Sequence, residues 1–359
     1  MNDAQARGDW PTPPNGRDGH PPSAFWLSRI WRDFEPRRGT LFLINIGLPI
    51  LIGMARGETS GALIGCITGL LLSLADNEGS LASRGRLTLI VAGGIAVGAF
   101  LGVWLKSFEA IFWIAFFLAV FAAGFLNQVG KGPHFSLRFG AISLAVVASF
   151  PAMSTLDYVY WGMAVLISLA SRIADHLING PLHYAGPWLG AGSFDRWGWV
   201  RFALAYAFAA TIGLWIGVES ASTRAVWISA ITLVLMVPDV RVTYSRVLGG
   251  MIGTAFAVLV VWLVTSVGQS TLLLCTTIFL AAFPLPSQVT RFWIFSGLVA
   301  VVVLLAWDLA STDPTLEPSL LWERLEDMGV GATLVLVFTA LVFPAETRSL
   351  LGVAVRKDQ

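Results

Sequence analysis

The chain has 359 residues, of which 56% are hydrophobic and 13% are charged, and its net charge at pH 7 is +1. A mean hydropathy of +0.73 excludes an ordinary soluble domain of this length and indicates a polytopic membrane protein. The net charge says little about partners, because the position of each charge matters more than the sum in a membrane protein. We expect a lipid bilayer around the chain and no nucleic-acid partner.

Residues 1–37 precede the first long apolar stretch. The first 23 residues are polar and rich in Pro and Gly, with no apolar core that could act as a cleavable signal peptide, and they predict a disordered tail. The segment "AFWLSRIWRDFEPRR" then places Trp26, Ile30 and Phe34 four residues apart. This spacing predicts a helix in the cytoplasmic interface of the membrane, with a simple aromatic and basic anchor as the alternative.

Twelve apolar stretches follow, near the roughly 20 residues that a bilayer core of about 30 Å requires. They lie near 40–56, 59–75, 87–105, 109–126, 136–153, 157–178, 200–217, 224–238, 245–266, 270–284, 291–309 and 323–343. The stretches at 224–238 and 270–284 are short, so a half-span or a re-entrant segment is an alternative there. The predicted fold class is an all-α polytopic membrane protein.

A Gly- and Pro-rich segment at 181–199 interrupts the hydrophobic pattern and predicts a cytoplasmic linker. It divides the chain into two six-helix halves, 38–180 and 200–345, followed by a cytoplasmic tail over 346–359. With both termini in the cytoplasm, all but four of the 23 Lys and Arg residues fall on the cytoplasmic side, as the positive-inside rule requires. The four exceptions are Arg56, Lys106, Arg224 and Arg324.

The two halves share a series of short sequence matches in the same order. The matched features are "IGCIT" at 64–68 with "ISAIT" at 228–232, Asp76 with Asp239, Arg86 and Gly93 with Arg246 and Gly253, Arg138 with Arg291, and Arg38 with Arg201. Together they predict an internal duplication. Because each half has an even number of spans, both copies share one orientation and are related by a pseudo-twofold axis along the membrane normal.

The second half resembles the fusaric acid resistance and aromatic acid exporter family. Its helix from Trp227 to Pro238, the hinge leading to Arg246, and Gly253 in the next helix match the family pattern. The start of the last helix also matches, through Arg324, Asp327 and Gly331. The resemblance implies a transporter of the bacterial inner membrane that exports aromatic or other small organic acids. Where the family pattern more commonly has Gln-Pro, this chain has Pro-Asp, at Pro238 and Asp239.

The two hinges after Asp76 and Asp239 carry the first group of candidate site residues. As copies related by a twofold axis, the two hinges would bring carboxylates and guanidiniums into one ring around that axis. Such a ring would suit the entrance of a path for an organic anion. The guanidiniums are those of Arg84, Arg86, Arg241 and Arg246. The alternative is structural: Pro238 ends one helix, Asp239 caps the next, and the arginines anchor the chain at the headgroups.

Three further charged residues are candidates inside or at the ends of spans. Arg138 and Arg291 lie at the predicted starts of their helices, where they anchor the chain, but they become functional candidates if the helices begin earlier. Asp308 follows the apolar run "VVVLLAW" and either carries a proton or ends the span. Arg172 and Asp175, three residues apart, are expected to pair with each other, as are Arg324 and Asp327.

The resemblance implies secondary transport of a small organic anion driven by protons, and we expect Asp76, Asp239 or Asp308 to be the coupling acid. The alternatives are a passive organic-anion channel and a non-transporting membrane scaffold. No enzymatic signature, metal site or cofactor motif is present in the sequence, and Cys66 and Cys275 lie about two hundred residues apart with no indicated pairing. A second copy of the chain and a periplasmic adaptor protein are the further partners considered.

Overall fold

The structure is a computed structural model that describes residues 35–76, 79–149, 154–182, 195–220, 225–268, 270–310 and 318–350. The predicted tail and interfacial helix before residue 35, most of the predicted linker, and residues 351–359 lie outside the described residues. Within the described part of the chain the regular structure is helical, and an isolated bridge joins Gly79 to Leu182.

Among the described residues, each predicted half contains six α-helices of 10 to 28 residues, with short additions. The first set comprises α2 (Pro36–Arg56), α3 (Thr59–Ala75), α4 (Leu81–Leu105), α5 (Glu109–Phe125), η2 (Leu126–Gln128), α6 (Lys131–Ser149) and α7 (Thr155–Asn179). The second comprises α8 (Arg196–Glu219), α9 (Val226–Leu235), α10 (Val240–Val267), α11 (Thr271–Ala282), η3 (Leu285–Gln288), α12 (Phe292–Ala310), α13 (Pro318–Val342) and α14 (Pro344–Leu350).

Eight of these helices are long and apolar enough to cross a membrane: α2, α4, α5 with η2, α7, α8, α10, α12 and α13. The chain is therefore an all-helical, multi-pass membrane protein. The other four predicted spans coincide with α3, α6, α9 and α11, so a total of twelve spans stays a prediction. Helix α9 has only 10 residues, which gives a length of about 15 Å, or half a bilayer core.

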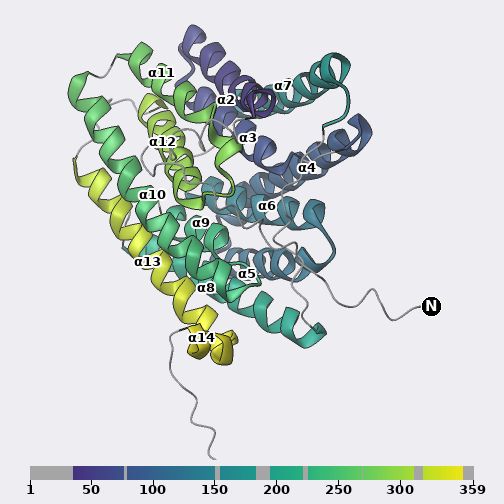
Figure 1. Cartoon of the computed structure of the whole chain (residues 1–359), viewed down its shortest axis with the longest axis vertical. Coiled ribbons are helices and arrows are strands. Elements are labelled where there is room, and N and C mark those ends of the chain that lie inside the picture. The colour runs from purple at the N-terminus through teal and green to yellow at the C-terminus, as the bar shows by residue number, and fades with distance from the viewer. Residues whose placement is uncertain are drawn as a thin grey trace, which may run out of the picture. The chain divides into compact units, whose positions relative to one another are not determined.

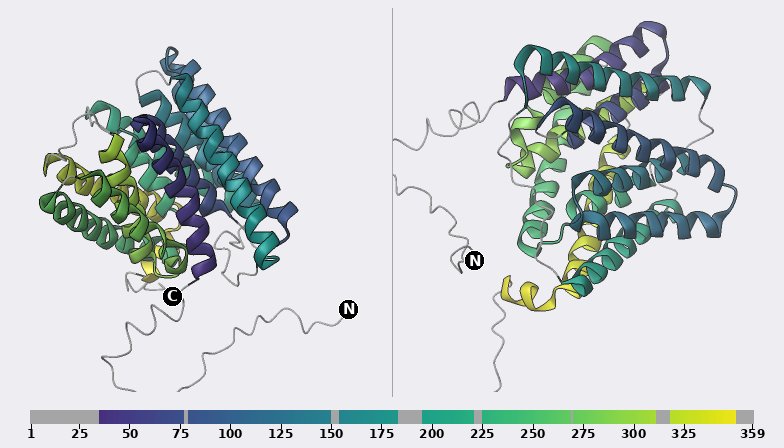
Figure 2. Two further views of the ribbon diagram at one scale, coloured as in Figure 1. Left: turned by 90° about the horizontal axis from the view of Figure 1, so that it is seen from above. Right: turned by 90° about the vertical axis from the view of Figure 1, so that its right-hand side faces the viewer.

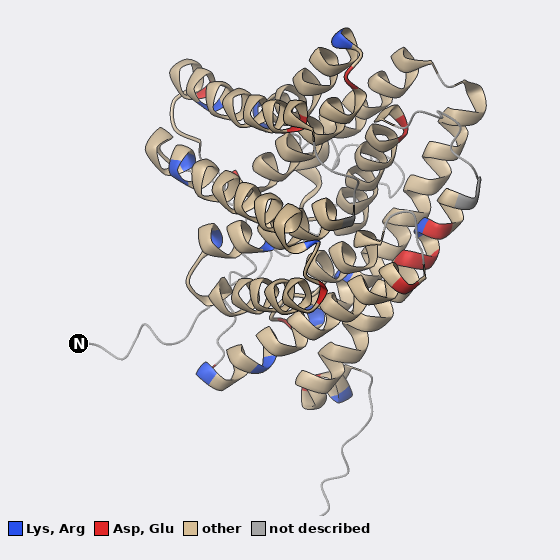
Figure 3. Ribbon diagram, turned by 180° about the vertical axis from the view of Figure 1, so that it is seen from behind, with Lys and Arg blue, Asp and Glu red and all other residues tan. Residues whose placement is uncertain are grey.

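Side-chain caps set several helix starts where the sequence changes from polar to apolar. The Asp239 side chain accepts a hydrogen bond from the Val242 backbone N–H at 2.8 Å, so it caps α10 as the structural interpretation predicted. Ser80 caps α4 in the same way. Ser154 and Asp157 form a reciprocal capping box at α7. Apart from caps such as Asp239 and Asp157, charged residues are sparse along the helices (Figure 3).

The pattern of helix packing repeats between the two sets. Helix α4 packs against α6 as α10 packs against α12, and α2 packs against α3 as α8 packs against α9. Glycines allow the first of these pairs to approach closely: a Cβ on Gly98 would overlap the Gly140 carbonyl, and a Cβ on Gly253 would overlap the Trp293 carbonyl. Figure 2 shows the same pairs from two further directions.

Helices from both sets also combine into two four-membered rings. Helices α5 and α9 each pack against both α6 and α8, and we call these four helices the α5 ring. Helices α3 and α11 each pack against both α2 and α12, and these four are the α11 ring. Figure 1 shows the α11 ring at the top and the α5 ring below it. Each ring therefore takes two helices from each half of the chain.

Candidate functional site

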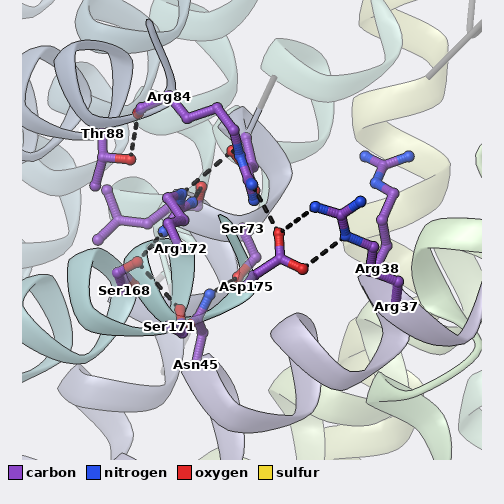
Figure 4. A network of polar contacts seen from close by, with 12 residues as sticks. Arg37, Arg38, Asn45, Ser73, Arg84, Thr88, Ser168, Ser171, Arg172 and Asp175 are labelled. Carbon is purple, nitrogen blue, oxygen red and sulfur yellow. Dashed lines mark hydrogen bonds and ion pairs between the residues drawn. The ribbon is translucent and has the colours of Figure 1, made fainter. Parts of the chain in front are cut away.

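A buried ionic network lies where α2, α3, α4 and α7 meet (Figure 4). Arg84 on α4 is fully buried and pairs with two carboxylates, Asp76 at 2.7 Å and Asp175 at 2.8 Å. Asp175 on α7 also binds Arg37 on α2 at 2.6 Å. Arg172 completes the network through Asp76, at 3.2 Å. The pairing of Arg172 with Asp175 that their spacing predicted is wrong, because each reaches a partner on another helix.

The charges in this network stabilise one another. Burial opposes ionisation of Asp76, but the guanidiniums of Arg172 and Arg84 outweigh it and hold the pKa of that carboxyl below its usual value. Asp76 is therefore a poor carrier of protons near neutral pH. Its position favours a structural role at the end of α3.

Arg37 also closes the end of α7. Its guanidinium donates to the carbonyl oxygens of Asn179, Gly180 and Pro181, at 3.4, 2.6 and 3.3 Å. These carbonyls lie at the helix C-terminus, where a cation is stabilised by the helix dipole. The network thus ties the first turn of α2 to the last turn of α7.

A second group of polar side chains gathers between α6, α8 and α10, and it contains two arginines. Arg138 and His134 come from α6, Tyr206 from α8 and Arg246 from α10. Arg138 is near enough for its charge to act on Arg246, and both arginines act on His134 and Tyr206. We call these four residues the cationic site. It joins the first half of the chain to the second.

Local structure explains why both arginines reach this site. Arg138 lies seven residues into α6 and Arg246 six residues into α10, which places each about 10 Å along its helix. The prediction that Arg138 begins a helix is wrong, because α6 begins at Lys131. Arg291 does precede α12, which begins at Phe292. The two arginines matched in the sequence therefore occupy different places.

The half-length helix α9 ends beside the cationic site. Two of its last backbone carbonyls accept hydrogen bonds from side chains. Arg246 donates to the Val234 carbonyl at 3.2 Å, and the Tyr206 hydroxyl donates to the Leu233 carbonyl at 2.8 Å. The Arg246 guanidinium also lies over the Phe292 ring, 5.2 Å from its centre. On the other side of the site, His134 Nδ1 lies 2.9 Å from the Ala123 carbonyl oxygen.

The cationic site differs from the ionic network in having no acid among the described residues. Arg138 and Tyr206 are buried and Arg246 is partly buried. None of the ion pairs found among the described residues includes Arg138 or Arg246. The buried Nε of Arg138 has no hydrogen-bond partner in the same set. Two neighbouring guanidiniums therefore share an interior site without a counter-ion from the described part of the chain.

The other predicted site residues are dispersed. Arg86, Arg241 and Asp239 are exposed, and Arg291 is half-buried. Asp308 is buried near the end of α12. No ion pair within the described ranges joins the Asp76 hinge to the Asp239 hinge, so the structure does not support a ring of charges drawn from both. Arg37, Arg172, Asp175, His134 and Tyr206 are polar site residues that were not predicted as such.

No metal site emerges from the described side chains, since none of them forms a group of three or more His, Cys, Asp or Glu residues suited to an ion. Cys66 and Cys275 are both free thiols in the core of the α11 ring.

Comparison with known protein families identifies the second half. Residues 202–338, from α8 into α13, match the family described as fusaric acid resistance protein-like. No curated protein and no solved structure matches the chain. The match confirms the resemblance that the helix ends around Pro238 and Arg246 predicted. By this match, residues 202–338 are similar to the fusaric acid resistance protein-like family.

Proposed function

We propose that this membrane protein is a secondary transporter of small organic anions, and that the cationic site binds the anion. The family match indicates a transporter-like role in a membrane. The observation that carries the proposal is the pair Arg138 and Arg246, two neighbouring guanidiniums with no acidic partner in the described part of the chain.

Physical chemistry favours an anion between these arginines. Removing a guanidinium from water costs several kcal/mol unless an opposite charge compensates, and two like charges nearby raise this cost further. A carboxylate accepts two parallel hydrogen bonds from one guanidinium, so a single organic acid could engage both arginines. The Phe292 ring beside Arg246 offers a flat apolar surface to an aromatic acid.

The remaining features of transport belong to the same proposal. The distribution of Lys and Arg supports a bacterial inner-membrane protein with both termini in the cytoplasm, and the family name supports aromatic and similar acids as exported substrates. Of the three predicted coupling acids, Asp308 is the best candidate, because it is buried inside α12. Asp76 is held in the ionic network and Asp239 caps a helix.

Counterflow of benzoate in proteoliposomes tests this function. Arg138→Gln and Arg246→Gln each remove one charge from the cationic site, whereas Arg241→Gln removes an exposed charge from the same helix as Arg246. We expect either site variant to lower the flux about tenfold or more, since a hydrogen bond to a charged group contributes roughly 1.5–3 kcal/mol. Arg241→Gln should retain wild-type flux. Equal flux in all four proteins would overturn the proposal.

Imposing a pH gradient in the same vesicles separates a carrier from a channel. A proton-coupled carrier accumulates benzoate only when the gradient is present, and Asp308→Asn should abolish that accumulation while counterflow continues. Downhill flux that is unaffected by the gradient and by Asp308→Asn would identify a passive channel instead. Both outcomes leave the cationic site as the anion-binding element.

A further inference from the structure

We infer that the anion crosses the protein through the α5 ring alone, and that a cavity at one end of this ring is the vestibule of that path. The inference rests on the proposed function and adds the route and a second binding region. It replaces the central axis between the two halves, where the sequence placed the path.

One hydrogen bond in each half shows which helices of the two halves correspond. Ser136 on α6 donates to the Ile90 carbonyl on α4 at 2.9 Å, and Ser296 on α12 donates to the Gly249 carbonyl on α10 at 3.4 Å. The two serines are 160 positions apart and the two carbonyls 159. Helices α6 and α12 therefore correspond, with an offset of 160 residues.

A second pair of bonds, to a side-chain hydroxyl in one half and to a backbone carbonyl in the other, gives a similar offset for the first two helices of each half. Asn45 on α2 donates to Ser73 on α3 at 2.9 Å, and Tyr206 on α8 donates to the Leu233 carbonyl on α9 at 2.8 Å. The donors are 161 positions apart and the acceptors 160. The α5 ring and the α11 ring are therefore equivalent places in the two copies, which allows one to serve as a control for the other.

A cavity of about 440 Å³ opens at the end of the α5 ring, a size typical of small-ligand sites. Its lining combines charged, aromatic and aliphatic side chains: Lys106, Glu109, Phe112, Trp113, Ala148, Leu214, Val218 and Ala225. Lys106 and Glu109 are exposed at its rim, whereas Phe112 and Leu214 are buried. The sequence predicts that this end faces away from the cytoplasm.

Three helices place this cavity in line with the cationic site. On α6, Ala148 follows Arg138 by ten residues, and on α8, Leu214 follows Tyr206 by eight. Along α9, Ala225 precedes Val234 by nine residues. At 1.5 Å per residue, the three separations are about 12–15 Å. The cavity and the cationic site therefore lie along the same helices of one ring, at different depths.

Both small and large side chains fill the interval between the two. On α6 the buried side chains between Arg138 and Ala148 are Phe139, Ala141, Leu144, Ala145 and Val147, and on α8 those between Tyr206 and Leu214 are Ala207, Ala209 and Ala210. At the offset of 160, the α12 residues that correspond to Ala141 and Ala145 are Val301 and Leu305, both buried. At these two positions of α6, the α5 ring therefore has smaller side chains than the α11 ring has on α12.

The vestibule suits an aromatic carboxylate. The ring centres of Phe112 and Trp113 lie 5.4 Å apart in an edge-to-face arrangement. The two rings provide apolar surfaces. Lys106 at the rim provides a cation for the carboxylate, while the acid Glu109 disfavours a second negative charge. A monoanion with one ring therefore fits this lining better than a small dianion such as a dicarboxylate.

Chemical blocking of the vestibule tests the route. In a Cys66→Ala/Cys275→Ala background, Ala148→Cys places a thiol in the cavity lining. Leu309→Cys places one at a half-buried position near the corresponding end of α12. A benzyl methanethiosulfonate adduct, confirmed by mass spectrometry, should lower benzoate counterflow about tenfold at Ala148→Cys. The same adduct should leave flux unchanged at Leu309→Cys.

The outcomes separate the route from the function. Full flux after complete modification of Ala148→Cys, or failure of that thiol to react, would overturn the vestibule. Loss of flux at Leu309→Cys as well would contradict a path confined to the α5 ring. If Arg138→Gln abolishes flux in these experiments, the proposed function stands whatever the adducts do. If Arg138→Gln retains flux, it is the proposed function that fails.

Discussion

The charge of Arg138 on α6 acts on Arg246 on α10 across the boundary between the two halves, and neither arginine has an acidic partner among the residues that the structure describes. Arg84, by contrast, is fully buried between two carboxylates. The chain thus contains two kinds of interior arginine. One kind is compensated by the protein, and the other is the kind that we propose binds a charge from outside.

This difference predicts opposite effects on stability. Arg84→Gln leaves Asp76 and Asp175 without their shared cation, and breaking a buried pair in this way costs about 3–5 kcal/mol, so the melting temperature in detergent should fall. Arg138→Gln removes an uncompensated charge, so the melting temperature should hold or rise while flux is lost. Equal destabilisation by both substitutions would show that Arg138 also has a structural partner.

The pH dependence of stability should depend on Asp76. Its pKa is lowered in the folded protein, so its contribution to stability is present above the unfolded pKa of about 4 and is lost as the pH falls through the lower folded value. We expect wild-type stability to fall over this acidic range and Asp76→Asn to show a shallower fall from a lower starting point. Melting curves between pH 3 and 7 measure this. Parallel curves would contradict the role given to the ionic network.

The positions of the helices followed from the sequence, because each apolar stretch and each cap is a local feature. Asp239 as the cap of α10 is an example. Site partners were harder to predict, since Arg37 and Asp175 are 138 residues apart and meet only through the packing of α2 on α7. Arg138 and Arg246 were both predicted as candidates, but their meeting depends on the α5 ring, which mixes helices of the two halves. Matching sequence motifs also aligned Arg138 with Arg291, whereas the hydrogen bonds of Ser136 and Ser296 give a different alignment.

An exchange of side chains between the two rings tests whether the small residue Ala145 lies on the path. Ala145→Leu gives the α5 ring the residue that α12 has at Leu305, and it should lower flux because the path is narrowed. Leu305→Ala should leave flux intact and cost about 2–5 kcal/mol of stability, as expected for a cavity in a packed core. Counterflow and melting of the two variants measure the two effects. Loss of flux in Leu305→Ala at full folded yield would contradict the assignment of the path.

Substitutions of two acidic residues should distinguish proton coupling from helix capping. Asp239→Ala removes the cap of α10 and should cost about 1 kcal/mol, with accumulation of benzoate under a pH gradient retained. Asp308→Asn should abolish accumulation and retain counterflow. The comparison uses one vesicle preparation per variant with the gradient imposed or collapsed. If Asp239→Ala rather than Asp308→Asn uncouples transport, the hinge is the coupling element.

The central claim is that Arg138 and Arg246 bind the anion, and calorimetric titration of benzoate into the detergent-solubilised protein tests it without requiring transport. We predict that Arg138→Gln and Arg246→Gln each raise the Kd about 10- to 100-fold, the loss expected for a charge-assisted hydrogen bond, while Arg241→Gln leaves it unchanged. An unchanged Kd in both site variants, with binding intact in the wild type, would contradict the account.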